Sequence, residues 1–268
     1  MRHLLLLGVL VFLTGTSFGQ GAEGIEAGAQ TITVRNFLHV AAPIVRESLA
    51  AIEGDNFTDV DLVEPFSPPT TLGGVTVTVN GVPQRIRSVS RTLVVFIVDA
   101  GGSGLRAVEL RTKTNVVHRS SFQVATAWPG LFVQSTGEDS EAFIPSGLWT
   151  TDGIQLLPLT SAPIQVGPAN RPTLVILQGS GWRQGTMMGG VQVRLNGIAC
   201  PLVAARSSAL FAGQDELVFQ VPAMLAGRGV MDMVVTVAGR ESNYARINLG
   251  NAITTSAKAS GAAPPKRQ

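Results

Sequence analysis

A stretch in which apolar and polar residues alternate occurs twice in the chain. In residues 73–82, valines at positions 75, 77 and 79 alternate with threonines, and an Asn-Gly pair follows. Successive side chains of a β-strand point to opposite faces, so this alternation predicts a strand with one apolar face. Asn-Gly tolerates the positive φ angles of a two-residue hairpin turn. Residues 189–198 repeat the pattern 116 positions later, so the sequence predicts the same hairpin twice.

The hairpin register predicts which residues share a face. With Asn-Gly as the turn, the first copy is expected to pair Val79 with Val82, Val77 with Gln84 and Val75 with Ile86. The second copy is expected to pair Leu195 with Ile198, Val193 with Cys200 and Val191 with Leu202. Paired residues lie on one face, so Cys200 is expected among branched apolar side chains and buried.

Cys200 is also the one cysteine of the chain, which excludes an internal disulfide. The alternative to a buried core thiol is a nucleophile or an intermolecular bridge.

Further strand-like segments recur in the same order in both halves. The pairs are 50–57 with 175–182, 92–98 with 216–221, 108–112 with 233–237, and 119–124 with 244–249. The loop before the first hairpin is nine residues longer than its counterpart, because the offset falls from 125 to 116 there. This repetition predicts a duplicated domain, and short strands with turn signals between them are typical of β-sandwiches. We place domain 1 at residues 31–127, and domain 2 with its connecting segment at residues 128–250.

Composition supports compact β structure. The chain has 268 residues, of which 45% are hydrophobic and 14% charged, with 30 glycines and 15 prolines. The formal net charge is +2 and no basic run stands out, so nucleic acid is a poor candidate partner.

The two ends of the chain predict export and a loose tail. Arg2 and His3 precede an apolar run over residues 4–13, and small residues follow, which is the pattern of a secretory signal peptide over residues 1–19. Ten apolar residues in a helix reach about 15 Å, against a bilayer core of about 30 Å, so no integral membrane segment is expected after cleavage. A flexible leader is expected at 20–30 and a disordered tail at 251–268. The predicted location is secreted, periplasmic or cell-surface.

The repeated motif resembles a known domain family. The stretches 73–83 and 189–197, with Phe219-Gln220-Val221-Pro222, resemble an uncharacterised tandem Ig-like (IPT/TIG-like) C-terminal domain family of exported bacterial, typically acidobacterial, proteins. The first copy departs from it, with Phe96-Ile97-Val98-Asp99 in place of the Gln-Val-Pro segment. The resemblance covers about residues 35–250. It implies an all-β protein of two tandem immunoglobulin-like β-sandwich domains, exported and surface-associated, without established catalytic residues.

No residue of the sequence is assigned a catalytic, cofactor-binding or metal-binding role. After the expected signal peptide, whose residues 15–19 read Gly-Thr-Ser-Phe-Gly, the sequence contains no Gly-x-Ser-x-Gly or Ser-x-x-Lys motif and no zinc-ligand spacing. His39 and His118 are expected at surface strand or loop positions. Acidic residues between positions 53 and 64 offer oxygen ligands to Ca²⁺, and a solvated acidic loop is the alternative. They are Glu53, Asp55, Asp59, Asp61 and Glu64.

Three tryptophans decide between two functional interpretations. Trp149 lies in a loop-like stretch and Trp182 follows a turn, so both are candidates for exposed positions, where they and Trp128 would stack on sugar rings. Packing between domains or loops is the alternative role for these large side chains. The sequence therefore predicts a non-enzymatic exported module with an adhesion, scaffolding or surface-interaction role. The alternative is a carbohydrate-binding module acting on extracellular polysaccharide. The expected partner is an unknown protein or glycan at the cell envelope.

Overall fold

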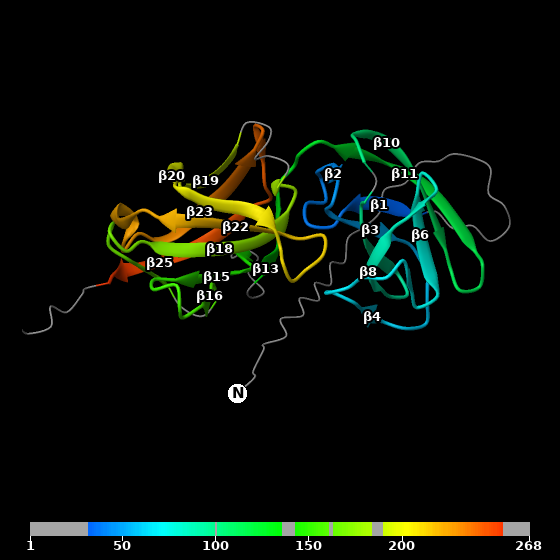
Figure 1. The fold of residues 1–268 in the computed structure, drawn as a ribbon, viewed down its shortest axis with the longest axis horizontal. Helices are drawn as coiled ribbons and strands as arrows, with labels where there is room; N and C mark the ends of the chain where they lie inside the picture. The colour runs from blue at the N-terminus through cyan, green and yellow to red at the C-terminus, as the bar shows by residue number, and fades with distance from the viewer. Residues whose placement is uncertain (1–31, 100, 136–142, 161–162, 184–189, 254–268) are drawn as a thin grey trace, which may run out of the picture.

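The computed structural model describes residues 32–99, 101–135, 143–160, 163–183 and 190–253. The described chain is built from β-strands, with one short 3-10 helix at Ala223–Leu225. Figure 1 shows two groups of strands side by side along the long axis, the first coloured blue to green and the second green to red. The prediction of an all-β sandwich fold is confirmed.

Two sheets form the first half of the described chain. Sheet A has the spatial order β1 (Thr33–Asn36), β3 (Leu49–Glu53), β9 (Leu93–Ile97), β8 (Arg85–Val89) and β4 (Leu62–Val63). Sheet B has the order β2 (Ile44–Val45), β11 (Val117–Ala125), β10 (Gly104–Arg111), β6 (Val75–Val79) and β5 (Thr71–Leu72), and β7 (Val82–Pro83) pairs with β6. Buried side chains from both sheets, including Val77, Phe96 and Leu110, form one core between them.

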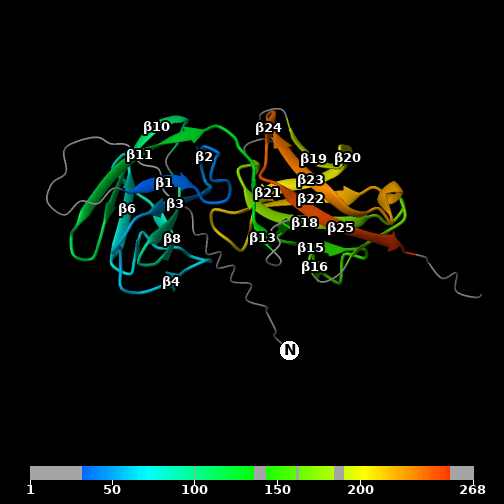
Figure 2. The same cartoon turned by 180° about the vertical axis from the view of Figure 1, so that it is seen from behind.

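The second half repeats this arrangement with its own core. Sheet C has the order β16 (Leu157–Pro158), β15 (Gly147–Thr150), β18 (Thr173–Ser180), β22 (Asp215–Val221) and β21 (Leu202–Ser207), and β12 (Gly130–Leu131) pairs with β18. Sheet E has the order β17 (Ile164–Val166), β25 (Ala245–Ala252), β23 (Gly229–Val237), β19 (Val191–Leu195) and β20 (Ile198–Cys200), and β24 (Arg240–Glu241) pairs with β23. A two-stranded sheet D pairs β13 (Val133–Ser135) with β14 (Phe143–Pro145). Figure 2 shows β23 and β25 of sheet E from behind.

Both predicted Asn-Gly turns are present. Asn80 and Gly81 have φ angles of 48° and 79°, and Asn196 and Gly197 have 45° and 79°. The pairs Val79 with Val82, Leu195 with Ile198, and Val193 with Cys200 follow the expected register. Alternate residues of β6 and β19 are buried, because one face of each strand packs on its core.

The predicted hairpins are too long at their open ends. Val75 does not pair with Ile86, and Val191 does not pair with Leu202. Ile86 instead pairs with Phe96 in sheet A, and Leu202 pairs with Phe219 in sheet C. The chain leaves one sheet after the turn and joins the facing one. Both routes present an apolar strand face to the same core, so alternation alone did not distinguish them.

Several expectations lie on residues outside the described ones. They are the signal peptide over 1–19, the leader over 20–30 and most of the tail over 251–268. β25 extends through Ala252. Within the described ranges, none of the helical segments has the length and apolar character that a membrane crossing requires.

Candidate functional site

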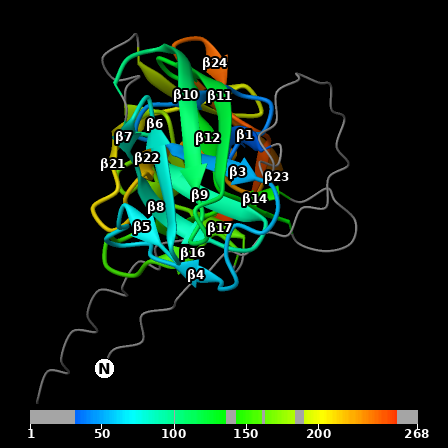
Figure 3. The same cartoon turned by 90° about the vertical axis from the view of Figure 1, so that its right-hand side faces the viewer.

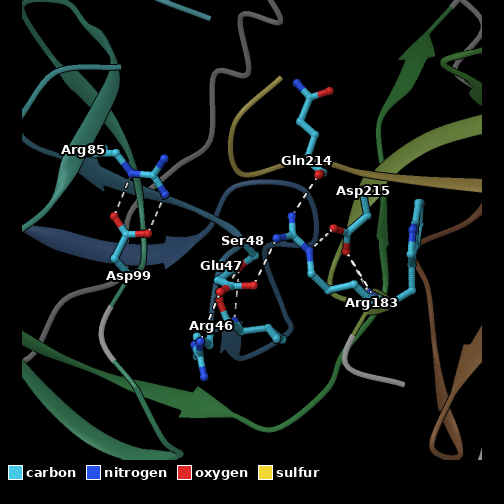
Figure 4. A network of polar contacts seen from close by, with 10 residues as sticks. Arg46, Glu47, Ser48, Arg85, Asp99, Arg183, Gln214 and Asp215 are labelled. Atoms are coloured by element: carbon cyan, nitrogen blue, oxygen red, sulfur yellow. Dashed lines mark hydrogen bonds and ion pairs between the residues drawn. The ribbon is translucent and has the colours of Figure 1, made fainter. Parts of the chain in front are cut away.

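Charged side chains connect the two halves of the chain (Figure 4). Asp215, at the start of β22, is only 1% exposed. Its carboxylate accepts hydrogen bonds from the backbone N–H groups of Trp182 (3.1 Å) and Arg183 (3.3 Å), and from Nε of Arg183. The same guanidinium reaches Glu47 of the first half, with 3.0 Å between Nη1 and Oε2, and donates to the backbone oxygen of Gln214 at 2.9 Å. We call Glu47, Arg183 and Asp215 the junction triad.

Two opposing effects act on the buried carboxylate of the junction triad. Burial raises the pKa of Asp215, because a charge is less well solvated away from water, and the charge and hydrogen bonds of Arg183 oppose that rise. A carboxylate held by one guanidinium and two backbone N–H groups is oriented in a single geometry. The arrangement is therefore suited to fixing the position of Arg183 relative to Glu47.

Glu47 adopts a backbone conformation that residues with side chains usually avoid. Its φ angle is 60°, in the left-handed region, and its N–H donates to the backbone oxygen of Val98 at 2.7 Å. Such a conformation costs about 1–2 kcal/mol for a residue other than glycine. Glycine would remove that strain, but it would also remove the carboxylate that contacts Arg46 and Arg183. The strain thus coincides with the contact that joins the halves.

An apolar contact lies beside the junction triad. Leu49 and Ile97 of sheet A are fully buried, and Phe132 and Ala212 of the second half pack on the cluster that they form. Gly213 has a φ angle of 76°, and a Cβ there would lie 2.8 Å from side-chain atoms of both Leu49 and Ile97. The loop between β21 and β22 therefore fits against sheet A only because position 213 has no side chain.

Aromatic rings extend this contact toward solvent. The rings of Phe66 and Phe211, one from each half, are stacked with centroids 5.5 Å apart. The guanidinium of Arg87 lies 5.7 Å from the centroid of Phe211, and its Nη1 donates to the backbone oxygen of Pro65 at 3.3 Å. Burial lowers the pKa of Arg87. Polar, apolar and aromatic contacts together hold the halves against each other.

Cys200 lies where the hairpin register predicted it. The thiol is buried in the core of the second half, and burial raises its pKa to about 12. A thiol with so high a pKa is almost entirely protonated at neutral pH, and the thiolate is the nucleophilic form. The prediction of a buried Cys200 is confirmed, and its chemistry does not favour the alternative of a nucleophile.

Trp149 and Trp182 are both buried, so the exposed positions that stacking on sugar rings would require are not found at these two residues. Trp149 lies on β15 opposite Val175, and Trp182 packs against Gly179, where a Cβ would lie 2.3 Å from the indole ring. Both indoles contribute to the core instead of offering a flat face to a sugar. Trp128 is half-buried, and the guanidinium of Arg240 lies 5.0 Å from its ring centroid. The turn signals near these residues were correct, but they did not reveal which way the side chains point.

The expected surface position of His118 is also wrong. His118 is buried on β11, and its ring meets that of Phe57 edge to face, with centroids 5.7 Å apart. His39 is half-buried beside Trp128, and burial lowers its pKa. Both rings are therefore packed against aromatic side chains.

The acidic residues of positions 53–64 have different surroundings. Glu53 accepts a hydrogen bond from Nε of Arg35 at 2.8 Å, whereas Asp59 and Asp61 line an open depression with Arg91. In the part of the chain that the structure describes, no group of three or more His, Cys, Asp or Glu side chains is placed to hold a metal ion.

Sequence reasoning missed all three members of the junction triad. The available signal was Asp215, which stands two positions before the apolar run of residues 217–219. Burying a carboxylate costs free energy unless it is paired, so a charge this close to a core strand indicates a partner. Its partners Glu47 and Arg183 are 136 positions apart, a separation that no local pattern reveals.

Comparison of the chain with models of known protein families finds no match, and comparison with curated proteins finds none either.

Proposed function

We propose that this is a non-enzymatic exported protein of two tandem immunoglobulin-like domains, with an adhesion, scaffolding or surface-interaction role. The observation that carries the proposal is the junction triad with its apolar surround, which holds two β-sandwiches in one relative orientation. A scaffold needs fixed spacing between the surfaces that it presents. Interfaces between domains otherwise permit relative motion unless they are extensive and well packed.

Matching sheets support duplication as the origin of the two halves. The order β3-β9-β8 in sheet A corresponds to β18-β22-β21 in sheet C, and β11-β10-β6 in sheet B corresponds to β25-β23-β19 in sheet E. An irregularity between Ile86 and Ser88 of β8 recurs between Leu202 and Ala204 of β21, at the same offset of 116 as the hairpins. Bulges are kept within a fold because they set the path of the strand. A shared bulge at a shared offset favours one ancestral domain.

The buried positions of the candidate reactive groups support a non-enzymatic role. Cys200 and His118 are buried, and in the junction triad the guanidinium of Arg183 pairs with both carboxylates. Fold alone does not define an activity, so the proposal depends on which surface binds and what it binds. Export is proposed from the sequence pattern of residues 1–19.

A sedimentation assay tests this function. The full chain, expressed with its own leader and purified from the exported fraction, is mixed with washed cell envelopes of the source organism and centrifuged. We expect saturable co-sedimentation that survives removal of loosely held proteins with salt. The proposal is rejected if the protein stays in the supernatant at every concentration, or if the purified protein turns over substrates of a hydrolase panel.

A further inference from the structure

The outer edges of the two equivalent sheets are covered differently. In sheet A, β4 lies outside β8 and pairs Leu62 with Val89 and Val63 with Ser88. In sheet C, β21 corresponds to β8, and among the described residues it is the outermost strand. β4 belongs to the loop that is nine residues longer in the first half. In the view along the long axis, β8 and β21 lie on the same side of the molecule (Figure 3).

The exposed fractions differ at a pair of equivalent positions in β8 and β21. Ile86 is 0% exposed, and its N–H donates to the backbone oxygen of Pro69, in the longer loop, at 2.7 Å. Leu202 occupies the equivalent position of β21 and is 38% exposed, and its neighbour Val203 is 52% exposed. A branched apolar side chain is therefore buried at this position in the first half and partly open to solvent in the second.

The backbone of β21 presents donors outward. The backbone N–H of Ser208 donates to the backbone oxygen of Gln214 at 2.9 Å, so it points toward β22. Backbone N–H groups of successive residues in an antiparallel strand point in opposite directions, and Ala205 is three residues before Ser208. The N–H of Ala205 therefore points away from β22. Val89, which corresponds to Ala205, has the same orientation and faces β4. An exposed row of unpaired backbone groups is a template for a further strand.

We propose that the outer edge of β21 binds an extended segment of another protein as an added antiparallel strand, equivalent to β4. This inference rests on the proposed duplication and specifies the partner of the proposed surface role. The covering strand of the first half has the sequence Asp61-Leu62-Val63, which defines the chemistry of the ligand as an acidic residue followed by two branched apolar residues.

Charge supports this choice of ligand. Continuing the register of Leu62 with Val89 places Asp61 opposite Ser90, and the residue of the second half equivalent to Ser90 is Arg206. The Arg206 side chain is 64% exposed at the end of β21, and its Nη2 lies 3.1 Å from Oε2 of Glu216, so an acidic residue of the added strand would share this cation with Glu216. In the same register the two apolar residues would lie opposite Ala205 and Ala204, the equivalents of Val89 and Ser88, and the residues that follow them would reach Val203 and Leu202. Backbone bonds supply affinity in such complexes and side-chain matches supply specificity.

A peptide titration tests the proposal. The probe is a synthetic peptide with the sequence of residues 59–66, added to the isotope-labelled full chain and followed by the amide resonances in NMR spectra. We expect saturable shifts at residues 202–207. Ala205→Pro removes the outward N–H, and proline is tolerated at such edge positions, so we expect binding to weaken about tenfold or more. The matched variant Ala205→Ser keeps the N–H and should bind within about twofold of the parent chain.

Other outcomes would overturn the proposal. Shifts at residues 85–89 would mean that the peptide replaces β4 in the first half. Concentration-dependent shifts at 202–207 without peptide would assign the edge to a second copy of this chain. If Ala205→Pro does not fold, a peptide carrying Leu62→Pro must fail to bind, and equal binding by it contradicts the proposal. Envelope sedimentation that is unchanged by Ala205→Pro, together with no peptide binding, would reject the edge site and leave the surface role intact.

Discussion

Replacing Arg183 by methionine tests whether the junction triad stabilises the protein. The substitution keeps an unbranched apolar stem but leaves the carboxylate of Asp215 buried with only its two backbone donors. Removing one partner of a buried ion pair typically costs 3–5 kcal/mol, because the remaining charge is uncompensated. Arg183 is itself 21% exposed, and two donors to Asp215 remain, so we expect a loss near the lower end of that range, about 3 kcal/mol. Most of the loss comes from Asp215, since the contact with Glu47 is better solvated.

Urea unfolding at pH 7 followed by tryptophan fluorescence measures this loss, with Trp182 buried next to the substituted residue. The control is Arg194→Met on the exposed face of β19, which should change the unfolding free energy by no more than about 0.5 kcal/mol. The double variant Arg183→Met/Asp215→Leu removes both charges and should be more stable than Arg183→Met alone. An Arg183→Met variant as stable as the Arg194→Met control, or a double variant with strictly additive losses, would refute a stabilising ion pair at the junction.

Three further expectations concern pH, packing and thiol chemistry. Burial raises the pKa of Asp215 above its usual 3.8, so the native state binds the carboxyl proton more tightly than the unfolded chain does. The unfolding free energy should therefore fall as the pH rises from about 3.8 through the raised pKa. Asp215→Asn should remove that part of the pH dependence in urea unfolding between pH 3.5 and 7, and an identical slope in both proteins would contradict it. Gly213→Ala should destabilise the protein by about 1–3 kcal/mol, because the added Cβ would overlap Leu49 and Ile97 and the backbone at position 213 has a positive φ angle. A thermal unfolding midpoint that does not change would argue against this contact. At pH 7.5, Cys200 should react with a thiol reagent at least about 100-fold faster in unfolding concentrations of urea than in the native protein, because burial raises the pKa of the native thiol to about 12 and unfolding removes that burial. Equal rates would show that the thiol is accessible in the native protein.

Local pattern was sufficient for the hairpins and for Cys200. The two Asn-Gly turns require positive φ angles that few other residue pairs tolerate, and they fix the register of the residues beside them. Register then determines the face of each side chain, so the burial of Cys200 follows from its distance along the strand from Gly197. These conclusions depend only on residues within a few positions of one another.

Side chains near turns were harder to place. Trp182 follows a glycine-rich turn, which suggested exposure, but the turn folds its indole back over Gly179 into the core. His118 lies in a polar stretch of β11, yet its face of the strand meets Phe57. The burial of a residue next to a turn depends on what the facing element supplies, and the facing residues here lie far away in the sequence.

The sequence by itself determined an all-β protein, its repeated hairpins, the burial of Cys200 and the equivalence of its two halves in strand pattern, because each of these follows from short-range periodicity. Tertiary structure alone decided three other features. It took β8 and β21 away from their expected hairpin partners into the facing sheets, and it joined Glu47 to Arg183 across 136 positions. Within the residues that the structure describes, it also left β21 without an outer strand like the one that β4 adds to β8. All three depend on which surfaces meet in space, and the energy of those contacts comes from burial that no single segment achieves alone.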